Sequence, residues 1–263
     1  MNLTFDERLV AVGTGIRTVG QLTGEALAWI KRADKVLYVL SDPVSERLIH
    51  DLNPTGAESL QHFYVENKVR REIYEQMIQL TLGYVRSGRV VCLAVYGHPG
   101  VFAFPTHESI RRARAEGYQA RMLPGVSAED CLFADFNIDP GSAGCQSYEA
   151  TDFLVNRRIT DPSSHLILWQ MIVLGDSTYR WQVDSPPAMR QFIARLTQQY
   201  PPDHVVYVYE ASIFPGVEAR IEPVTIAQLG QVRYTTMSTL YVPPCVAPRA
   251  DLQLYQSLGI PLG

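Results

Sequence analysis

The chain has 263 residues, of which 46% are hydrophobic and 19% are charged, as is typical of a globular protein with one large domain or two lobes. The formal net charge is −4, and the scattered lysines and arginines argue against a binder of nucleic acids. The longest apolar runs are too short to span a bilayer and the first residues do not form a secretory leader, so we expect a cytoplasmic protein that binds no membrane.

Strands and helices alternate through the first half of the chain. Short apolar runs predict strands over residues 8–12, 35–42, 89–97 and 118–123. Helical spacing of apolar residues predicts helices over residues 23–33, 71–88 and 105–117. Thr23 is expected to open the first of these helices, and Gly88 to end the second. This alternation indicates βαβ units, and hence an α/β lobe with a mostly parallel sheet.

The pattern changes near Pro124. Ser127, followed three residues later by Asp130, predicts a capping box at the start of a short helix. One further helix is predicted over residues 186–200, and strands are predicted over residues 145–150, 165–171, 204–211, 220–226 and 238–244. We therefore expect an N-terminal α/β lobe over residues 1–123, a mixed, strand-rich lobe over residues 124–246, and an extended tail over residues 247–263.

Residue spacing does not predict a metal site. No CxxC pair occurs among the four cysteines, which are expected to be reduced and mostly buried: Cys92, Cys131, Cys145 and Cys245. Asp130, Asp135 and Asp139 are carboxylates in one region of the chain, but capping and turn roles are expected for them. We therefore expect no bound metal.

Glycine-rich loops follow three of the predicted strands. In VGTGI, Gly13 and Gly15 follow the first strand, but Thr18 stands where the dinucleotide fingerprint has its third glycine. This pair therefore fits a ligand loop and a plain tight turn equally well. LPGVSAED also follows a strand and opens a helix, whose first amides can meet an anion.

The stretch YGHPGVFAFP, residues 96–105, is the most specific of the three loops. It follows a buried strand and should lie at the carboxyl edge of the sheet, where open α/β sheets bind ligands. Val101 and Phe102 supply an apolar wall. His98 is a candidate hydrogen-bond donor, base or turn residue. We predict that this loop contacts a ligand.

Five stretches, VGTGI, YGHPGVFAFP, LPGVSAEDCLFADFNIDPG, SYEATDFL and STLYVPP, together resemble the tetrapyrrole-methylase superfamily of S-adenosylmethionine enzymes. More narrowly, residues 9–244 resemble the borosin-type peptide backbone N-methyltransferases. This resemblance implies two α/β lobes with the methyl donor in the cleft between them, and an interlocked homodimer.

The resemblance also implies which residues hold S-adenosylmethionine and its product, S-adenosylhomocysteine. These residues are Gly13, Tyr96, His98, Val101, Phe102, Ser127, Ala128, Gln170, Ser238 and Thr239. Reasoning from the residues themselves supports only the three glycine-bearing loops. The assignments of Gln170, Ser238 and Thr239 depend on the resemblance alone.

The stretch YVENKVRREIY carries two tyrosines and an arginine that match the family pattern. By resemblance, Tyr64, Arg70 and Tyr74 carry the methylation chemistry. Arg70 and Tyr74 are four residues apart and therefore share one face of a helix. The fused fungal members of the family have a further tyrosine where this chain has Gln61, which leaves one hydrogen-bonding role unassigned.

A peptide nitrogen is a poor nucleophile because its lone pair is delocalised into the carbonyl group. Methylation therefore needs a base for the N–H proton and a partner for the charge that develops on the oxygen. We expect the Arg70 guanidinium to lower the pKa of a neighbouring phenol, so that Tyr64 or Tyr74 acts as the base and the other binds the oxygen. The sequence does not choose between the two tyrosines.

The fused relatives carry their own substrate peptide at the C-terminus, whereas this chain stops soon after STLYVPP. We therefore expect a separate precursor peptide, bound in trans as an extended strand. The expected assembly is a homodimer, which forms a heterotetramer with two precursors.

Three other functions compete with this interpretation. A C-methyltransferase acting on a porphyrin or corrin precursor would favour a cleft lined with arginine and lysine. A dehydrogenase would use the first glycine pair, although Thr18 counts against it. A binding module without activity would not need the tyrosines and arginine of YVENKVRREIY.

Overall fold

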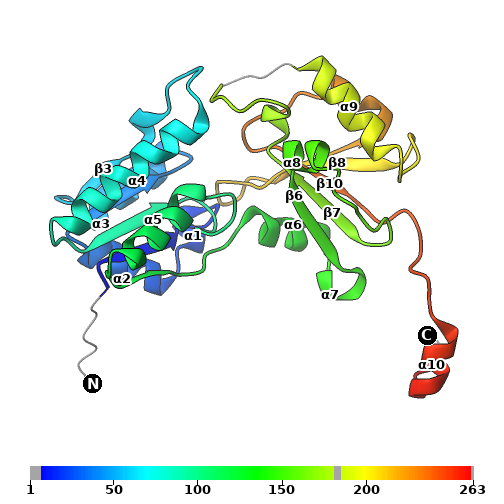
Figure 1. Cartoon of the computed structure of the whole chain (residues 1–263), viewed down its shortest axis with the longest axis horizontal. Helices are drawn as coiled ribbons and strands as arrows, with labels where there is room; N and C mark the ends of the chain where they lie inside the picture. Colours follow the sequence, from blue (N-terminus) through cyan, green and yellow to red (C-terminus); the bar gives the residue numbers. More distant parts are fainter. Residues whose placement is uncertain (1–6, 181–184, 262–263) are drawn as a thin grey trace. The chain divides into compact units, whose positions relative to one another are not determined.

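The computed structural model describes residues 7–180 and 185–261 (Figure 1). Contacts between residues divide these into two units. The first unit takes residues 7–137, 177–180 and 211–220, and the second takes residues 138–176, 185–210 and 221–261. The first unit therefore runs past Pro124, where the sequence pattern changes, to Asn137, and two later segments of the chain complete it.

The first unit is built on a parallel sheet, with strand order β3-β2-β4-β1-β5. Its strands are β1 (Leu9–Gly13), β2 (Lys35–Val39), β3 (Ala57–Ser59), β4 (Val91–Val95) and β5 (Ala120–Met122). Each pair of neighbours is parallel, and Leu9 of β1 lies between Val91 of β4 and Ala120 of β5. The parallel sheet expected from the sequence is confirmed, and β3 is an additional edge strand.

Helices of the first unit follow its strands in sequence. They are α1 (Thr18–Gln21), α2 (Gly24–Arg32), α3 (Pro43–Leu52), α4 (Arg70–Arg86), α5 (Phe104–Ala115) and α6 (Ala128–Phe136), with a 3-10 turn η1 (Gln61–Phe63). The Thr23 hydroxyl accepts a hydrogen bond from the Ala26 N–H at 3.1 Å, so the predicted cap of α2 is confirmed. Asp42 belongs not to a strand but to the N-cap of α3, which the sequence patterns did not predict.

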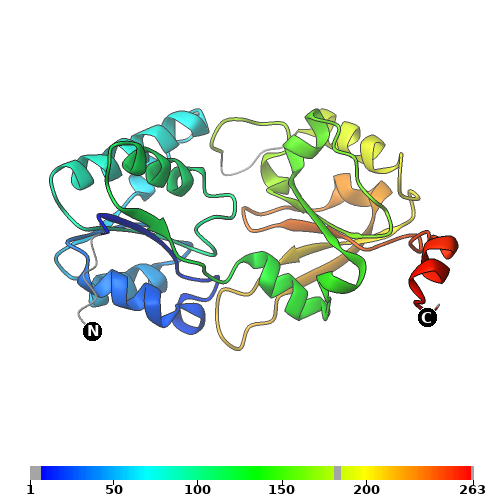
Figure 2. The same ribbon diagram turned by 60° about the horizontal axis from the view of Figure 1, so that its bottom comes forward.

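Both faces of this sheet are buried, as expected for parallel strands covered by helices (Figure 2). Successive residues of β1 point to opposite faces, so Leu9 and Ala11 pack with α4 and α5 while Val10 and Val12 pack with α2 and α3. Cys92 of β4 is fully buried in the second of these layers. The other three cysteines are only partly buried, contrary to the expectation of mostly buried thiols.

The second unit contains a mixed sheet with strand order β6-β7-β10-β8-β9. Its strands are β6 (Cys145–Glu149), β7 (His165–Trp169), β8 (Val205–Glu210), β9 (Arg220–Thr225) and β10 (Thr239–Val242). β6 and β7 are parallel, whereas β10 is antiparallel to both β7 and β8. The other elements are α7 (Pro140–Ala143), α8 (Ala150–Val155), η2 (Met171–Val173), α9 (Pro186–Leu196) and η3 (Ile226–Gln231). Residues of α8, α9 and η3 pack on one face of this sheet.

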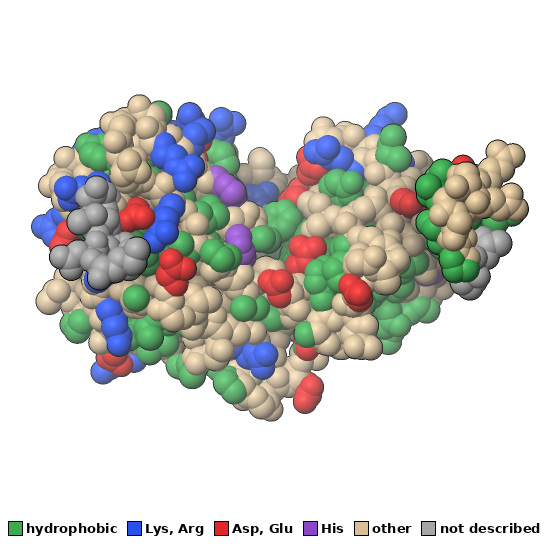
Figure 3. All heavy atoms as spheres, turned by 90° about the horizontal axis from the view of Figure 1, so that it is seen from below, with side chains coloured by type: hydrophobic (Ala, Val, Ile, Leu, Met, Phe, Trp, Pro, Cys, Tyr) green, Lys and Arg blue, Asp and Glu red, His purple; other side chains and the backbone are tan. Residues whose placement is uncertain are grey.

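The tail is not extended throughout, because α10 forms over Leu252–Leu258. The Asp251 side chain caps it by accepting a hydrogen bond from the Leu254 N–H at 3.0 Å, and Gly259 ends it with a φ of 66°. No residue of α10 is buried, and hydrophobic side chains show on its surface at the right of Figure 3. None of the helices in residues 7–180 and 185–261 combines the length and apolar character needed to cross a membrane.

Candidate active site

Three loops meet at the carboxyl edge of the first unit's sheet, after β1, β4 and β5. A Cβ atom on Gly13 would lie 2.2 Å from the Gly97 carbonyl oxygen and 3.2 Å from the Gly125 Cα atom. The three backbones are therefore in direct contact, which requires glycine at position 13. Close packing of the three loops is thus enough to explain why position 13 is a glycine. That Gly13 also contacts a methyl donor stays a prediction.

Hydrogen bonds fix the YGHPG loop in place. His98 Nδ1 accepts a hydrogen bond from the Gly100 N–H at 2.9 Å, so this ring nitrogen carries no proton here. From the first turn of α5, the Thr106 hydroxyl donates to the Pro99 carbonyl oxygen, and His107 Nε2 donates to the Gly100 carbonyl oxygen at 2.8 Å. The loop is held on both sides, and Nε2 is the nitrogen of His98 that can meet a ligand.

Two aromatic side chains of this loop are exposed. Tyr96 is 42% exposed and Phe102 is 44% exposed. Phe102 has a φ of 51°, in the left-handed region that is rare for residues other than glycine and common at functional sites. Val101, predicted beside them, is partly buried. Exposed rings on a fixed loop are suited to contact the flat rings of a nucleoside.

Ser127 and Asp130 form the predicted capping box at the start of α6. The Ser127 hydroxyl donates to the Asp130 carboxylate at 2.7 Å and accepts from the Asp130 N–H, while the Ser127 N–H donates to the same carboxylate at 2.6 Å. The Ala128 N–H follows directly after this capping box, at the helix start, where the first amides have no acceptor within their own helix. Asp139 caps α7 by accepting from the Gly141 N–H, so the capping roles expected of Asp130 and Asp139 are confirmed.

Tyr64, Arg70 and Tyr74 come together in the first unit. Tyr64 follows η1, Arg70 is the first residue of α4, and Tyr74 lies one turn further along. The Arg70 charge acts on both phenols, and Tyr64 also interacts electrostatically with Tyr74 and Tyr96. No residue in the described part of the chain forms a hydrogen bond with the Tyr64 or Tyr74 hydroxyl. These hydroxyls are therefore available to a substrate.

Burial, not Arg70, dominates the acidity of these phenols. Burial raises the pKa of Tyr64, and the neighbouring phenols Tyr74, Tyr96 and Tyr179 raise it further, while Arg70 lowers it. Burial also raises the pKa of Tyr74, with Arg70 acting in the opposite direction. Arg70 thus lowers the pKa of both phenols, as expected, but the loss of hydration outweighs the guanidinium charge, so the net pKa of each phenol is raised.

Three of the predicted donor-binding residues share one edge of the second unit's sheet. Gln170 follows β7, and Ser238 directly precedes β10. Leu240 pairs with Leu168 in antiparallel register, so two residues further on Ser238 lies opposite Gln170, with Thr239 beside it. The other seven predicted donor-binding residues lie in the first unit.

The Ser238 side chain is occupied by its own unit. Its hydroxyl donates to Glu210 Oε1 at 2.5 Å and accepts from the Thr235 N–H at 2.7 Å, and the Thr235 hydroxyl donates to the same carboxylate oxygen at 2.9 Å. Glu210 therefore fixes the turn before β10. A ligand at this edge would meet the main chain of Ser238 rather than its hydroxyl.

Sequence reasoning missed two aromatic neighbours of the tyrosines. The Tyr179 ring lies 4.9 Å from the Tyr64 ring, and the Phe104 ring lies 6.1 Å from the Tyr74 ring, measured between centroids. Phe104 follows the YGHPG loop closely, so its position in the sequence could have indicated it. Tyr179 lies between two predicted elements of the second lobe, and no local pattern relates it to Tyr64.

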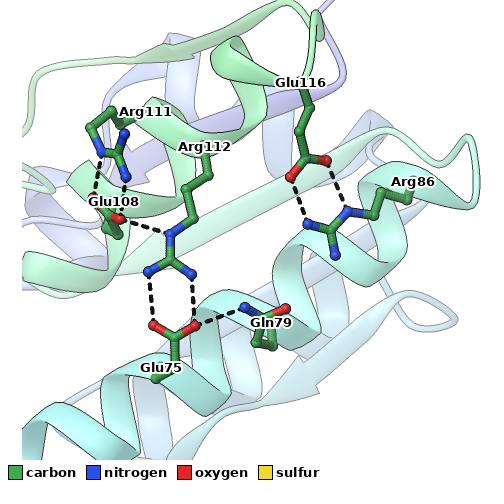
Figure 4. Close-up of polar contacts among 7 residues, drawn as sticks. All are labelled: Glu75, Gln79, Arg86, Glu108, Arg111, Arg112 and Glu116. Atoms are coloured by element: carbon green, nitrogen blue, oxygen red, sulfur yellow. Dashed lines mark hydrogen bonds and ion pairs between the residues drawn. The ribbon is translucent and has the colours of Figure 1, made fainter.

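Ion pairs join α4 to α5 (Figure 4). The Arg112 guanidinium forms two hydrogen bonds with the Glu75 carboxylate, at 2.6 and 2.8 Å, and a third with Glu108 at 2.7 Å. At the C-terminal end of α4, the Arg86 guanidinium forms two hydrogen bonds with the carboxylate of Glu116, the residue that follows α5. Hydrogen bonds from Arg112 hold the pKa of Glu75 at about 2. These pairs fix the helix that carries Arg70 and Tyr74 against the helix that follows the YGHPG loop.

Residues 8–229 match a family described as tetrapyrrole (corrin/porphyrin) methylases. The chain belongs to this family. The match runs from the strand before the first glycine loop into η3, and so includes residues of both units.

Relatives of this chain have names that join a methyltransferase to a peptide precursor. One is a methyltransferase/ribosomally synthesized type III borosin cyclic peptide precursor from Anomoporia bombycina, 44% identical over 90% of this chain and 28% of its own length. A type I borosin cyclic peptide precursor from Coprinopsis marcescibilis is 44% identical over 94% of this chain and 64% of its length. The omphalotin A precursor from Omphalotus olearius is 40% identical over 96% of this chain and 61% of its own length. The chain thus spans less than two thirds of the length of each of these relatives.

Solved structures share the fold at low sequence identity. The uroporphyrin-III C-methyltransferase from Thermus thermophilus has a TM-score of 0.62 and 19% identity, covering 96% of this chain and 99% of that one. A cobalt precorrin-4 methyltransferase has a TM-score of 0.61 and 17% identity, and the match covers 89% of this chain and 94% of that one. The tetrapyrrole-methylase fold expected from the sequence is confirmed.

Proposed function

We propose that this chain is an S-adenosylmethionine-dependent methyltransferase that methylates backbone amide nitrogens of a ribosomal precursor peptide. The observation that carries the proposal is the arrangement of Tyr64, Arg70 and Tyr74, in which one guanidinium acts on two phenols whose hydroxyls are not bonded to the described protein. The names of the relatives, which join a methyltransferase to a peptide precursor, support the same chemistry.

The first unit offers groups that suit the methyl donor. When bound, S-adenosylmethionine supplies an electrophilic methyl carbon on a positively charged sulfur. The exposed rings of Tyr96 and Phe102 fit such a ligand, because aromatic faces attract cations and stack on adenine. The Ala128 N–H at the start of α6 can donate to a carboxylate. That Gln170, Ser238 and Thr239 of the second unit also contact the donor stays a prediction.

Burial separates the roles of the two phenols. We assign Tyr64 as the hydrogen-bond donor to the amide oxygen, because burial and three neighbouring phenols keep it protonated. Tyr74 is assigned as the base, because Arg70 precedes it by one turn of α4 and lowers its pKa against the effect of burial. Tyr74 first loses its proton to water, and its oxygen then takes the amide N–H proton as the nitrogen gains the methyl group.

The surroundings of these tyrosines suit a peptide with apolar side chains. Val65 is 54% exposed, Val69 is 41% exposed and Phe104 is 45% exposed. An extended peptide would present successive amides to the same phenols. That the peptide is a separate chain, and that the enzyme is a homodimer forming a heterotetramer with two precursors, stay predictions.

The direct test supplies the protein with a precursor peptide as a separate chain and with S-adenosylmethionine carrying a deuterated methyl group. Fragmentation by mass spectrometry should show deuterated methyl increments on backbone nitrogens, and Tyr74→Phe should abolish most of them. Methylation of a uroporphyrinogen with an unmodified peptide would replace this proposal by tetrapyrrole C-methylation. No methylation of the peptide in trans, with methylation after fusing it to the chain, would correct only the prediction of a separate substrate.

A further inference from the structure

A short segment of the chain covers the loop that carries Tyr64. This segment, residues 177–180, is here named the strap. It follows η2 of the second unit in sequence, yet by its contacts it belongs to the first unit. Thr178 of the strap and Val69, just before α4, form an isolated antiparallel bridge. The strap therefore acts as a short strand laid along the loop between Tyr64 and α4.

Backbone hydrogen bonds attach the strap to residues 67–70, the part of this loop next to α4. The Tyr179 N–H donates to the Lys68 carbonyl oxygen at 2.8 Å, and the Asn67 N–H donates to the Tyr179 carbonyl oxygen at 2.8 Å. The Arg70 N–H donates to the Ser177 carbonyl oxygen at 3.1 Å. The last bond satisfies an amide at the start of α4, which has no partner within its own helix. The strap thus restrains the backbone of the residue that carries the guanidinium.

The side chain of Tyr179 restrains the other end of the loop. Its ring is tilted by 46° against the Tyr64 ring, with 4.9 Å between centroids. Tyr64, Tyr74 and Tyr179 all pack against the same core cluster below α4 and α5. A tilted contact of this kind fixes ring orientation. Without it, the Tyr64 side chain would face water on one side and could occupy other rotamers.

We propose that Tyr179 is a positioning residue for methylation, because its ring and the strap backbone hold Tyr64 and the start of α4 in one arrangement. This inference rests on the proposed function for the roles of Tyr64 and Arg70. Tyr179 itself takes no part in proton transfer. The ring, not the hydroxyl, is therefore the part of the side chain that turnover depends on.

Two substitutions separate the ring from the hydroxyl. Tyr179→Phe keeps the ring contact and should retain kcat within about threefold of wild type, whereas Tyr179→Ala should lower kcat by about ten- to a hundredfold. The KM for S-adenosylmethionine should change little in either variant, because the strap contacts the loop of Tyr64 rather than the YGHPG loop. Tyr255→Ala in α10 is the matched control, since its helix contacts none of these residues through a hydrogen bond.

A second measurement does not require activity. Tyrosine labelled with ¹³C at Cζ reports the ionisation of each phenol by NMR, and the Tyr64 signal is assigned by its loss in Tyr64→Phe. In wild type this signal should not move between about pH 8 and 11, because burial and neighbouring phenols raise the pKa of Tyr64. In Tyr179→Ala the pKa should fall toward its usual value of about 10, so the signal should move. Tyr179→Phe keeps the ring against Tyr64 and removes only the smaller electrostatic effect of its phenol, so its titration should lie much closer to wild type than that of Tyr179→Ala. Tyr255→Ala should resemble wild type.

The two measurements distinguish the inference from the proposed function. If the Tyr64 signal moves in Tyr179→Ala but wild type methylates no peptide, either in trans or fused to the chain, the strap positions Tyr64 and the proposed function is wrong. If wild type methylates the peptide and Tyr179→Ala does so equally fast with an unchanged Tyr64 titration, the inference is overturned. Hydrogen exchange at the Asn67, Arg70 and Tyr179 amides gives a further check, because Tyr179→Ala should increase exchange there while the fold persists by circular dichroism.

Discussion

The Arg112 guanidinium of α5 makes two parallel hydrogen bonds with the Glu75 carboxylate of α4, the residue next to Tyr74. Arg112 is 27% exposed and Glu75 is 44% exposed, so water screens much of their attraction. We expect Arg112→Gln to lower the melting temperature by no more than about 2 °C. Differential scanning calorimetry checks this value. A larger loss would mean that the ion pair is better shielded than its exposure indicates.

The same ion pairs predict a pH dependence of stability. Hydrogen bonds from Arg112 and Gln79 hold the pKa of Glu75 at about 2, below its usual 4.5. Because the folded-state pKa is lowered, the stabilisation is complete above about pH 4.5 and is lost as the pH falls toward 2. The difference in melting temperature between wild type and Arg112→Gln should therefore be largest near neutral pH and shrink below about pH 4. A difference that grows in acid would contradict this linkage.

Removing either phenol should reduce turnover without preventing donor binding. Tyr74→Phe deletes the proposed base and Tyr64→Phe deletes the proposed donor to the amide oxygen. Each should lower kcat by about a hundredfold or more, while calorimetric affinity for S-adenosylhomocysteine stays near that of wild type. Tyr255→Phe serves as a tyrosine control outside the site. Near wild-type turnover in Tyr74→Phe would sink the assigned roles.

Arg70 should set the pH at which methylation accelerates. Burial raises the pKa of Tyr74 and Arg70 lowers it, so kcat should rise with pH through the range above neutral. Arg70→Ala should move this rise to higher pH, and Arg70→Lys, which keeps a charge, should move it less. Single-turnover rates from about pH 7 to 10 measure the shift. Identical pH profiles for the three proteins would exclude Arg70 as the group that tunes the base.

Gly13 should tolerate no side chain, unlike a glycine elsewhere in the same unit. A Cβ atom at Gly13 would overlap the Gly97 carbonyl oxygen, at 2.2 Å, so Gly13→Ala must displace two loops. We expect it to lower the free energy of unfolding by about 1–3 kcal/mol and to weaken donor binding. Gly83 in α4 has no atom within 4 Å of such a Cβ, and Gly83→Ala should stabilise by about 0.5–1 kcal/mol. Urea unfolding of both variants tests the contrast.

Local chemistry made part of the fold predictable. The Thr23 cap of α2 and the Ser127–Asp130 capping box depend on residues three positions apart, so the sequence contains all the information they need. The buried strands were predictable for the same reason. By contrast, α3 was missed because Asp42 was included in the preceding apolar run instead of being recognised as a cap before Pro43.

The candidate site was only partly predictable. The family resemblance indicated Tyr64, Arg70 and Tyr74, and the structure places them together in one unit. The resemblance could not indicate whether burial or the Arg70 charge has the larger effect on the pKa of the two phenols, because burial depends on the packing of the folded chain. Tyr179 is more than a hundred residues from Tyr64 in sequence, and Glu210 meets Ser238 only through strand pairing. Contacts of this kind have no local sequence pattern.

The way the strap returns to the first unit affects how this protein could be dissected. A fragment ending at Asn137 would retain all five strands of the parallel sheet but lose residues 177–180 and 211–220. The amides of Asn67 and Arg70 would then lose their acceptors, and one side of the Tyr64 ring would be uncovered. A single cut after Asn137 therefore cannot yield the complete first unit, and any shortened version must include the strap from later in the polypeptide.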